Sequence, residues 1–313
     1  MKQLRLAIIG ECMVELQTKQ GELKQAFGGD TLNTALYFAR LTGHLDVQTS
    51  YVTALGSDPF SKQMLAAWQA EGIDTNLVQC VDGKQPGIYY IETDDEGERT
   101  FFYWRNDAAA KYMFDQPQAN ALFDALFGYD GVYVSGITLA ILTVDGRAKL
   151  FEFLEQYKKR GGKVYFDNNY RPKLWSSPLE AQATYQKILS YVDIALLTFD
   201  DEKELYGDKD IEQCIERTGN AGVQEIIIKR GAKECLVVDG ELAKFVAPKP
   251  VANVVDTTAA GDSFSAGFLA KRLVGGKPTD AAAAGHTVAG KVIQYQGAII
   301  PRDAMPDLAL SLS

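Results

Sequence analysis

Five short apolar runs recur along the chain, and each ends in glycine or a polar residue. They are LRLAIIG (4–10), GVYVSG (131–136), KVYFDNN (163–169), IALLT (194–198) and EIIIKRG (225–231). Runs of this kind are typical of strands buried on both faces, as in a parallel sheet. Between two of them, residues 144–157 carry apolar side chains at three- and four-residue spacing, which predicts an amphipathic helix. We therefore expect right-handed βαβ units in an α/β fold, with a doubly wound, mostly parallel sheet covered by helices on both faces.

Two segments depart from this alternation. Residues 87–105 contain two β-branched and aromatic runs about a polar TDDEG turn, which predicts an antiparallel hairpin. Residues 12–29 predict two further short strands around a Gly turn, and 237–250 a hairpin at the edge of the core. We expect a discontinuous β lid formed by 12–33 and 87–107, inserted in a core formed by 1–11, 34–86 and 108–313.

Charge and cysteine content exclude several classes of protein. The formal charge is −9 without a basic stripe, which argues against nucleic acid or an anionic membrane as partner and favours a small molecule. The four cysteines are far apart with no C-x-x-C pair, so neither a disulfide framework nor a zinc site is expected. No secretory leader is apparent and no apolar run reaches the ~20 residues of a membrane span, so we expect a cytoplasmic protein.

The stretch DTTAAGDSFSAGFLA (256–270) places small residues and then an acid at the start of a predicted helix. The first backbone N–H groups of a helix lack partners and carry partial positive charge. Ala259, Ala260 and Gly261 would leave those groups open to a phosphoryl group, and Asp262 beside them could accept a proton from an attacking hydroxyl. Alternatively, Asp262 only complements the helix dipole and the small residues allow close packing.

This stretch resembles the carboxyl-terminal signature of the ribokinase-like (PfkB) family of sugar and nucleoside kinases, usually D-T-x-G-A-G-D. Ala259 stands where glycine is commoner; alanine disfavours a left-handed backbone but keeps its amide, so we expect the anion hole to be retained. AFGGDTLNTALYFARLTG (26–43) is similar to the amino-terminal signature of the same family. The likeness extends from the first strand to about residue 300. It implies a ribokinase-like fold with an ATP site in the core and a sugar site under the lid.

The resemblance also implies roles for individual residues. Asp262 would be the catalytic base, and the amides from Ala259 to Asp262 would form the anion hole. The sugar would meet Gly29, Asp30 and Asn33. The nucleotide side would include Asn169, Arg171, Thr198, Lys229, Gly231, Ala232, Ala259 and Gly261. The implied cofactors are ATP and Mg²⁺, with a monovalent cation such as K⁺ held near Asp256.

One motif departs from the family pattern. Members of the family generally have N-x-x-E after the strand that corresponds to IALLT, where it organises metal-bound water. Here the residues are TFDDE, so Thr198 and Asp201 fall where Asn and Glu are expected. Asp201 would then act on the metal through water. Alternatively, the acids at 200–202 form only a solvated first turn of a helix that suits the helix dipole.

Side chains of the hairpin indicate the kind of sugar. Tyr103 and Arg105 are two residues apart on one strand and therefore on the same face, with Tyr89 on the partner strand. Arg171 follows a core strand. Two arginines with phenols suit capture of a carboxylate, and the pattern is similar to the 2-keto-3-deoxygluconate kinase branch of the family. Alternatively, the tyrosines only stiffen the hairpin, Arg105 pairs with Asp107 and Arg171 contacts only ATP phosphates.

These features predict an ATP-dependent kinase that phosphorylates an acid sugar, 2-keto-3-deoxy-D-gluconate, at its 6-hydroxyl. The alternatives are another ribokinase-like enzyme, such as a fructokinase or a nucleoside kinase, and a sugar-binding protein without catalysis. No G-x-x-x-x-G-K-[ST] motif is present and no G-x-G-x-x-G follows the first strand, which argues against a P-loop enzyme and a dehydrogenase. Exposed edges of the lid hairpins could pair two subunits in a homo-oligomer.

Overall fold

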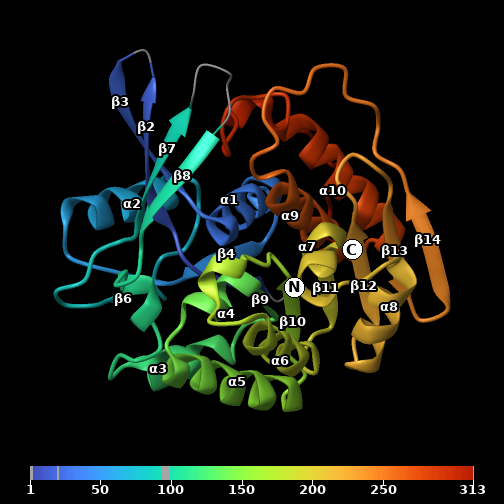
Figure 1. The fold of residues 1–313 in the computed structure, drawn as a ribbon, viewed down its shortest axis with the longest axis horizontal. Helices are drawn as coiled ribbons and strands as arrows, with labels where there is room; N and C mark the ends of the chain where they lie inside the picture. Colours follow the sequence, from blue (N-terminus) through green and yellow to red (C-terminus); the bar gives the residue numbers. More distant parts are fainter. Residues whose placement is uncertain (1–2, 20, 94–98, 313) are drawn as a thin grey trace.

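A mixed eight-stranded sheet forms the centre of the computed structural model, which describes residues 3–19, 21–93 and 99–312 (Figure 1). The strand order is β14-β13-β12-β11-β10-β9-β1-β4. The parallel strands are β1 (Leu4–Ile9), β4 (Val47–Val52), β9 (Gly131–Ser135), β10 (Lys163–Asp167), β11 (Ile194–Thr198) and β12 (Glu225–Lys229). β13 (Cys235–Asp239) and β14 (Leu242–Val246) continue the sheet as antiparallel strands.

The predicted fold class is confirmed by this sheet. All five apolar runs form parallel strands, and the predicted edge hairpin corresponds to β13 and β14. β4 was not among the predicted strands, because its sequence VQTSYV mixes polar and apolar residues and lacks the continuous apolar run of a central strand. It occupies an edge of the sheet, next to β1.

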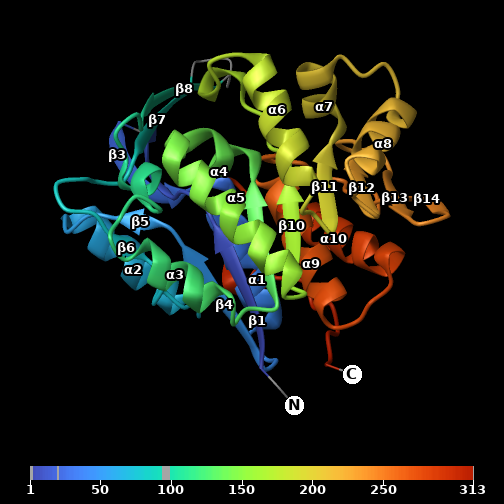
Figure 2. The same cartoon turned by 90° about the horizontal axis from the view of Figure 1, so that it is seen from below.

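Helices cover both faces of the sheet (Figure 2). On one side, the core includes residues of α3 (Ala119–Leu126), α4 (Gly136–Ile141), α5 (Val144–Lys159), α6 (Pro178–Leu189), α7 (Phe199–Tyr206) and α8 (Ile211–Asn220). On the other side, it includes residues of α1 (Asp30–Thr42), α2 (Pro59–Ala70), α9 (Ala260–Leu273) and α10 (Pro278–Val292). Short 3₁₀ turns lie at Ala109–Tyr112, Pro172–Leu174 and Arg302–Ala304.

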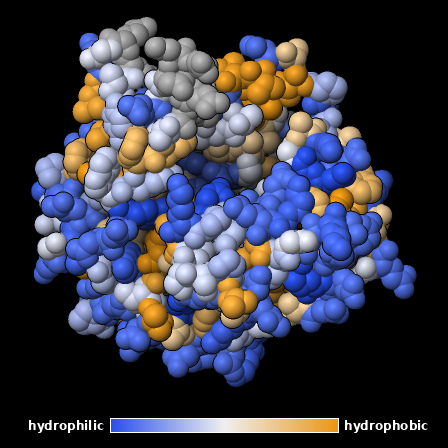
Figure 3. Space-filling model, viewed as in Figure 1, coloured by the Kyte–Doolittle hydropathy of each residue, from blue (hydrophilic) through white to orange (hydrophobic). Residues whose placement is uncertain are grey.

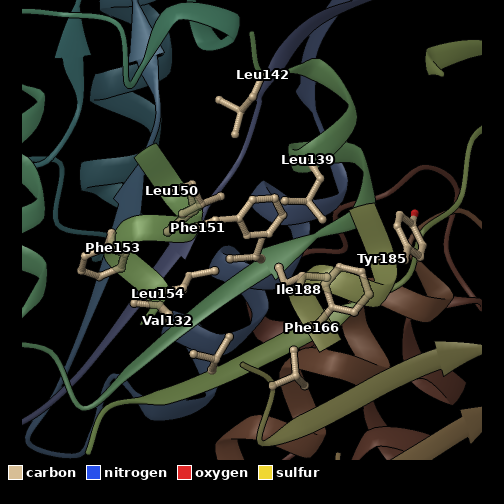
Figure 4. Close-up of a cluster of buried hydrophobic side chains, with 14 of the residues drawn as sticks. Val132, Leu139, Leu142, Leu150, Phe151, Phe153, Leu154, Phe166, Tyr185 and Ile188 are labelled. Carbon is tan, nitrogen blue, oxygen red and sulfur yellow. The ribbon is translucent and has the colours of Figure 1, made fainter. Parts of the chain in front are cut away.

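Alternation along the strands explains the two cores. On β1, Ala7 and Ile9 belong to the first core, whereas Leu6 and Ile8 belong to the second. Figure 4 shows part of the first core, where Phe151 and Leu154 of α5 pack with side chains of β9, β10 and α6. The predicted helix from residue 144 is confirmed; it starts after Thr143, whose hydroxyl accepts a hydrogen bond from the Gly146 amide.

A second, four-stranded sheet lies beside the core at the end where β7 and β8 are labelled in Figure 1. Its order is β3-β2-β7-β8, with β2 (Met13–Lys19), β3 (Glu22–Gly28), β7 (Ile88–Thr93) and β8 (Arg99–Trp104). Both predicted hairpins are present as antiparallel pairs, and β2 and β7 join them in parallel. Most of the predicted TDDEG turn lies outside the described residues. A two-stranded sheet, β5 (Ala54–Leu55) with β6 (Gln79–Cys80), lies apart from both.

The helices are too short or too polar to cross a bilayer. Within residues 3–19, 21–93 and 99–312, no helix combines the length and the apolar character that a membrane span requires.

Candidate active site

A large cavity opens at the carboxyl ends of the parallel strands, between the core and the four-stranded sheet. Its volume is about 1970 Å³, and the surface of the molecule is hollowed there in Figure 3. Ligands of doubly wound sheets bind at this end of the strands. The cavity brings together most of the residues that the sequence singled out: Gly29, Asp30, Asn33, Tyr89, Tyr103, Arg105, Asn169, Arg171, Thr198, Asp201, Lys229, Gly231, Ala232, Ala259, Ala260, Gly261 and Asp262. Asp256 is not part of its lining.

The N-terminus of α9 forms one wall of the cavity. The helix begins at Ala260 and its N-cap is Ala259, which has a left-handed backbone with φ of 59°. We expected alanine to disfavour this conformation; the structure adopts it nevertheless. Within the described chain, the amides of Ala259, Gly261 and Asp262 have no hydrogen-bond partner. The Ala260 amide donates to the Thr257 carbonyl at 3.2 Å, so three of the four amides that were predicted to form an anion hole are free.

The strained backbone of Ala259 leads to a stability prediction. A left-handed backbone at alanine destabilises the folded state by about 1–2 kcal/mol. Glycine avoids this strain, but its unfolded chain is more flexible, and the extra entropy lost on folding lowers stability by about 0.5–1 kcal/mol. We therefore expect Ala259→Gly to raise the free energy of unfolding by about 0.5 kcal/mol, measured by urea denaturation. Ala260→Gly is the matched control and should lower it, because Ala260 lies in the helix. A loss of stability in Ala259→Gly would contradict this account.

Asp262 lies in the first turn of α9 and faces the first turn of α1. Its Oδ2 accepts a hydrogen bond from Asn33 Nδ2 at 2.8 Å. Burial and, next, the charge of Asp30 raise the pKa of Asp262 to about 7; the Asn33 hydrogen bond and Lys229 act in the opposite direction. A carboxyl group with a pKa near neutrality suits proton transfer from a hydroxyl better than an ordinary aspartate does.

Asp30 is the first residue of α1, three positions before Asn33. Its Oδ2 accepts hydrogen bonds from Ser135 Oγ and from Asn169 Nδ2, the latter at 3.2 Å. Burial raises the pKa of Asp30, while the Ser135 hydrogen bond lowers it. Gly29 permits a close approach here, because a Cβ atom at this position would lie 2.3 Å from the Glu11 carbonyl oxygen.

A buried ion pair lies behind the N-terminus of α9. Lys229 Nζ donates to Asp167 Oδ2 at 2.6 Å, and Ser265 Oγ of α9 donates to the same oxygen at 2.8 Å. These bonds tie β12, β10 and α9 together where the cavity meets Gly261. Asp167 was not among the residues predicted from the sequence, although an acid at the end of the apolar run KVYFD was a usable signal.

Arg171 and Asp201 meet in the wall of the cavity. Arg171 donates to the Tyr170 carbonyl at 2.6 Å and to Asn169 Oδ1 at 3.0 Å, and its Nη1 lies 3.5 Å from Asp201 Oδ2. Asp201 also accepts the Tyr170 amide at 3.0 Å. Burial raises the pKa of Asp201, and the charge of Arg171 opposes this shift.

The three acids of α7 have different environments, so a uniformly solvated first turn is not what the structure contains. Asp200 is exposed and pairs with Lys203, whereas Asp201 lines the cavity. Glu202 is buried and binds Arg217 and Asn168. Glu202, Asp208 and Cys214 are close enough to share a metal ion, but Arg217 pairs with both acids and takes that place.

Tyr89 of β7 and Arg105, which follows β8, each bind an acid of the segment 11–15. Tyr89 and Tyr103 are directly opposite each other on β7 and β8, with ring centroids 5.8 Å apart. The Tyr89 hydroxyl donates to Glu15 of β2. Arg105, one residue beyond β8, pairs with Glu11, and its buried Nε has no partner. Glu11 and Glu15 were not predicted from the sequence, because their partners are 94 and 74 positions away.

The alternative pairing of Arg105 with Asp107 is wrong. Asp107 accepts hydrogen bonds from Lys84 Nζ at 2.5 Å and from the Tyr112 hydroxyl at 2.7 Å. Asp107 makes these contacts at the surface, where its side chain is 69% exposed. Arg105 is 9% exposed and turns towards the cavity instead.

Asp256 organises the loop that precedes α9. One carboxylate oxygen accepts the Thr258 amide and hydroxyl, and the other accepts Gln296 Nε2 and the Gly297 amide, each at 3.0 Å or less. The loop is thereby joined to the segment after α10. Asp256 does not line the cavity, but its hydrogen bonds fix Thr258, which does.

Fold and site together define the class, a ribokinase-like small-molecule kinase with a helix N-terminus and a half-buried acid at the strand ends. The chain belongs to the pfkB family of carbohydrate kinases, which matches it over residues 3–305. A 2-dehydro-3-deoxygluconokinase from Escherichia coli (strain K12) is 54% identical over 305 residues, 96% of this chain and 99% of that protein. A fructokinase from Salmonella typhimurium is 28% identical over 277 residues, 87% of this chain and 86% of that protein.

Solved structures share the fold at low sequence identity. A protein provisionally assigned as ribokinase II from E. coli, in complex with ATP and Mg²⁺, has a TM-score of 0.81 and 20% identity, covering 98% of this chain and 97% of that chain. Aminoimidazole riboside kinase from Salmonella enterica, complexed with its riboside and an ATP analog, has a TM-score of 0.81 and 22% identity, covering 97% of both chains. These likenesses confirm the predicted ribokinase-like architecture.

Proposed function

We propose that this protein transfers the γ-phosphoryl group of ATP to the 6-hydroxyl of 2-keto-3-deoxy-D-gluconate, which is also called 2-dehydro-3-deoxygluconate. The observation that carries this proposal is Asp262, a half-buried acid with a pKa raised to about 7 beside three free amides of a helix N-terminus. The name of the 54% identical relative supports the choice of sugar. Arg105 and Arg171 in the same cavity support an acidic substrate.

The geometry supports an in-line displacement. Asp262 would take the proton of the 6-hydroxyl as its oxygen forms a bond to the γ-phosphorus and the bond to the ADP oxygen breaks. The amides of Ala259, Gly261 and Asp262 would stabilise the charge on the transferred group, and each such donor contributes about 2.7–4 kcal/mol. Asp30 and Asn33 would hold sugar hydroxyls beside the base. Positioning and electrostatics would supply most of the rate.

The nucleotide would bind across the ends of β11 and β12. Thr198, Lys229, Gly231 and Ala232 line this part of the cavity, and Asn169 and Arg171 lie at its border with the sugar. Asp201 fits Mg²⁺ through water, because it is a carboxylate that lines the cavity near these residues. Bound Mg²⁺ would neutralise charge on the β- and γ-phosphates.

Four finer features complete the proposal. We propose that the lid formed by 12–33 and 87–107 covers the sugar, because Met13, Tyr89 and Tyr103 line the cavity from that side. Its edge strands β3 and β8 offer a surface for a homo-oligomer. A monovalent cation such as K⁺ would need backbone carbonyls of the Asp256 loop, since both Asp256 oxygens already accept hydrogen bonds. Because the enzyme would use ATP, we propose a cytoplasmic location.

A coupled ADP-release screen tests the proposed reaction. The purified protein is assayed with ATP, Mg²⁺ and each of a keto-deoxy acid, fructose, ribose and a nucleoside. We expect kcat/KM for 2-keto-3-deoxy-D-gluconate to exceed that for the neutral sugars by about 10²-fold, since those substrates offer no carboxylate to the two arginines. A higher kcat/KM for fructose or for the nucleoside would favour the alternative kinases. Binding without ADP release would favour a non-catalytic sugar-binding protein.

The raised pKa of Asp262 predicts the pH dependence of the reaction. The carboxyl group accepts a proton only when it is ionised, and with a pKa of about 7 its ionised fraction falls as the pH drops below that value. We expect log kcat/KM to rise with a slope of one up to about pH 7 and to be level above it. Asp30→Asn should move the midpoint to lower pH in its residual activity, because it removes a nearby negative charge. A rate that is constant from about pH 5 to about pH 8 would contradict Asp262 as the base.

A further inference from the structure

Glu11 lies in the loop between β1 and β2 and lines the lid side of the cavity. Its side chain is 2% exposed and its Oε2 is bound by Nη2 of Arg105, which is itself 9% exposed. Taking both charges out of water is unfavourable, so an ion pair this deeply buried is weak evidence for a stabilising role. Its place beside the proposed sugar site points to a role in binding.

The guanidinium of Arg105 is only partly satisfied by Glu11. An arginine side chain has five N–H donors, yet the hydrogen bond that Arg105 makes within the described residues is the one from Nη2 to Glu11. The buried Nε has no partner. A buried donor without an acceptor is unfavourable, and the Arg105 side chain to which it belongs lines a cavity large enough for a sugar. Glu11 therefore fixes the guanidinium of Arg105 through Nη2, while the Nε–H group still lacks an acceptor.

Two glycines allow Glu11 to approach this position. A Cβ atom at Gly87 would lie 3.0 Å from Glu11 Oε1 and 3.0 Å from Arg105 Cβ. A Cβ atom at Gly29 would lie 2.3 Å from the Glu11 carbonyl oxygen. Gly29 precedes Asp30 at the start of α1, so the same close packing places the ion pair next to the residues proposed to hold the sugar.

We propose that Glu11 is a positioning residue for the acid sugar: it holds the Arg105 guanidinium so that the N–H groups that Glu11 does not bind receive the substrate carboxylate. This inference rests on the proposed function. A guanidinium can bind two carboxylates through different N–H groups, and its positive charge between them offsets their repulsion. Without Glu11, the long Arg105 side chain would lose its fixed orientation and part of its preorganisation for the substrate.

Steady-state kinetics of Glu11 variants test this proposal. We expect Glu11→Ala to raise KM for the keto-deoxy acid about 10- to 100-fold, with kcat within about threefold and KM for ATP unchanged. KM for fructose, which has no carboxylate, should not change in the same variant. Glu11→Gln keeps an oxygen acceptor for Arg105 Nη2 and should restore most of the affinity. Glu22→Ala is the matched control, because it removes an exposed lid acid that pairs with Lys24.

A double-mutant cycle separates positioning from a structural role. If Glu11 acts through Arg105, Glu11→Ala should add no increase in KM for the acid in an Arg105→Ala background. An unchanged or lowered KM in Glu11→Ala, or an equal increase in both backgrounds, would overturn the proposal. Calorimetric titration of the keto-deoxy acid without ATP gives the same comparison independently of turnover. Wild-type protein that binds the acid without phosphorylating it would refute the proposed reaction but leave this test intact, whereas wild-type protein that does not bind it would refute the inference as well.

Discussion

Asp262→Asn should lower kcat by about 10²–10⁴-fold and leave the Kd for ATP within about threefold of wild type. Asparagine has the shape of aspartate but cannot accept the proton of the sugar hydroxyl. The free amides of Ala259 and Gly261 remain in place, so the phosphates keep their binding site. The measurements are steady-state turnover of the keto-deoxy acid and calorimetric titration of ATP.

The matched control for this variant is Asp280→Asn. Asp280 is also an acid in the first turn of a helix, α10, but it is exposed and does not line the cavity. If Asp262 only complemented the helix dipole, both variants would have similar, small effects. Unchanged kcat in Asp262→Asn would exclude Asp262 as the base.

The unfolding temperature of Asp262→Asn shows whether a loss of activity comes from lost catalysis or from misfolding. Folding raises the pKa of Asp262 above its ordinary value of 3.8 to about 7, so the fold favours the protonated carboxyl. That contribution to stability is complete below pH 3.8 and is lost as the pH rises through about 7. Asp262→Asn carries no charge at neutral pH and should therefore unfold at the same temperature as wild type or a higher one.

Arg105→Ala should raise KM for the keto-deoxy acid by about 10²-fold, while the Kd for ATP changes little. Arg105 lines the cavity and is a cation that the structure buries beside the four-stranded sheet, where the sugar is proposed to bind. Arg105→Lys should recover only part of the loss, because an ammonium group cannot form the planar two-point contact. Lys84→Ala is the control, since Lys84 is a cation of the same region that pairs with Asp107 and does not line the cavity.

Removing Arg105 also leaves Glu11 buried without its partner, which should lower the free energy of unfolding. Arg105→Ala is therefore compared with the Arg105→Ala and Glu11→Ala double variant, in which no unpaired charge remains. Both should bind the acid sugar weakly. Equal losses of affinity for the keto-deoxy acid and for fructose would argue against a role for Arg105 in binding the carboxylate.

The core strands were predictable because burial on both faces produces uninterrupted apolar runs, and the same logic failed for β4 at the edge. The gathering of Asp30, Asn169 and Lys229 in one cavity was expected because parallel strands end at a common edge, where α1 also begins. Arg105 lies beside Glu11 and not beside Asp107, since sequence proximity does not decide which way a side chain turns. Ala259 is left-handed because the surrounding loop overrides its local preference.

Assembly of the reaction centre depends on both ends of the chain. Asn33 and Asp262, which share a hydrogen bond, are 229 positions apart. A nascent or truncated polypeptide that stops before α9 contains the start of α1 but has neither Asp262 nor the free amides. If Asp262 is the base, phosphoryl transfer becomes possible only after α9 has been synthesised and has folded against α1, so an incomplete chain would not consume ATP at this site.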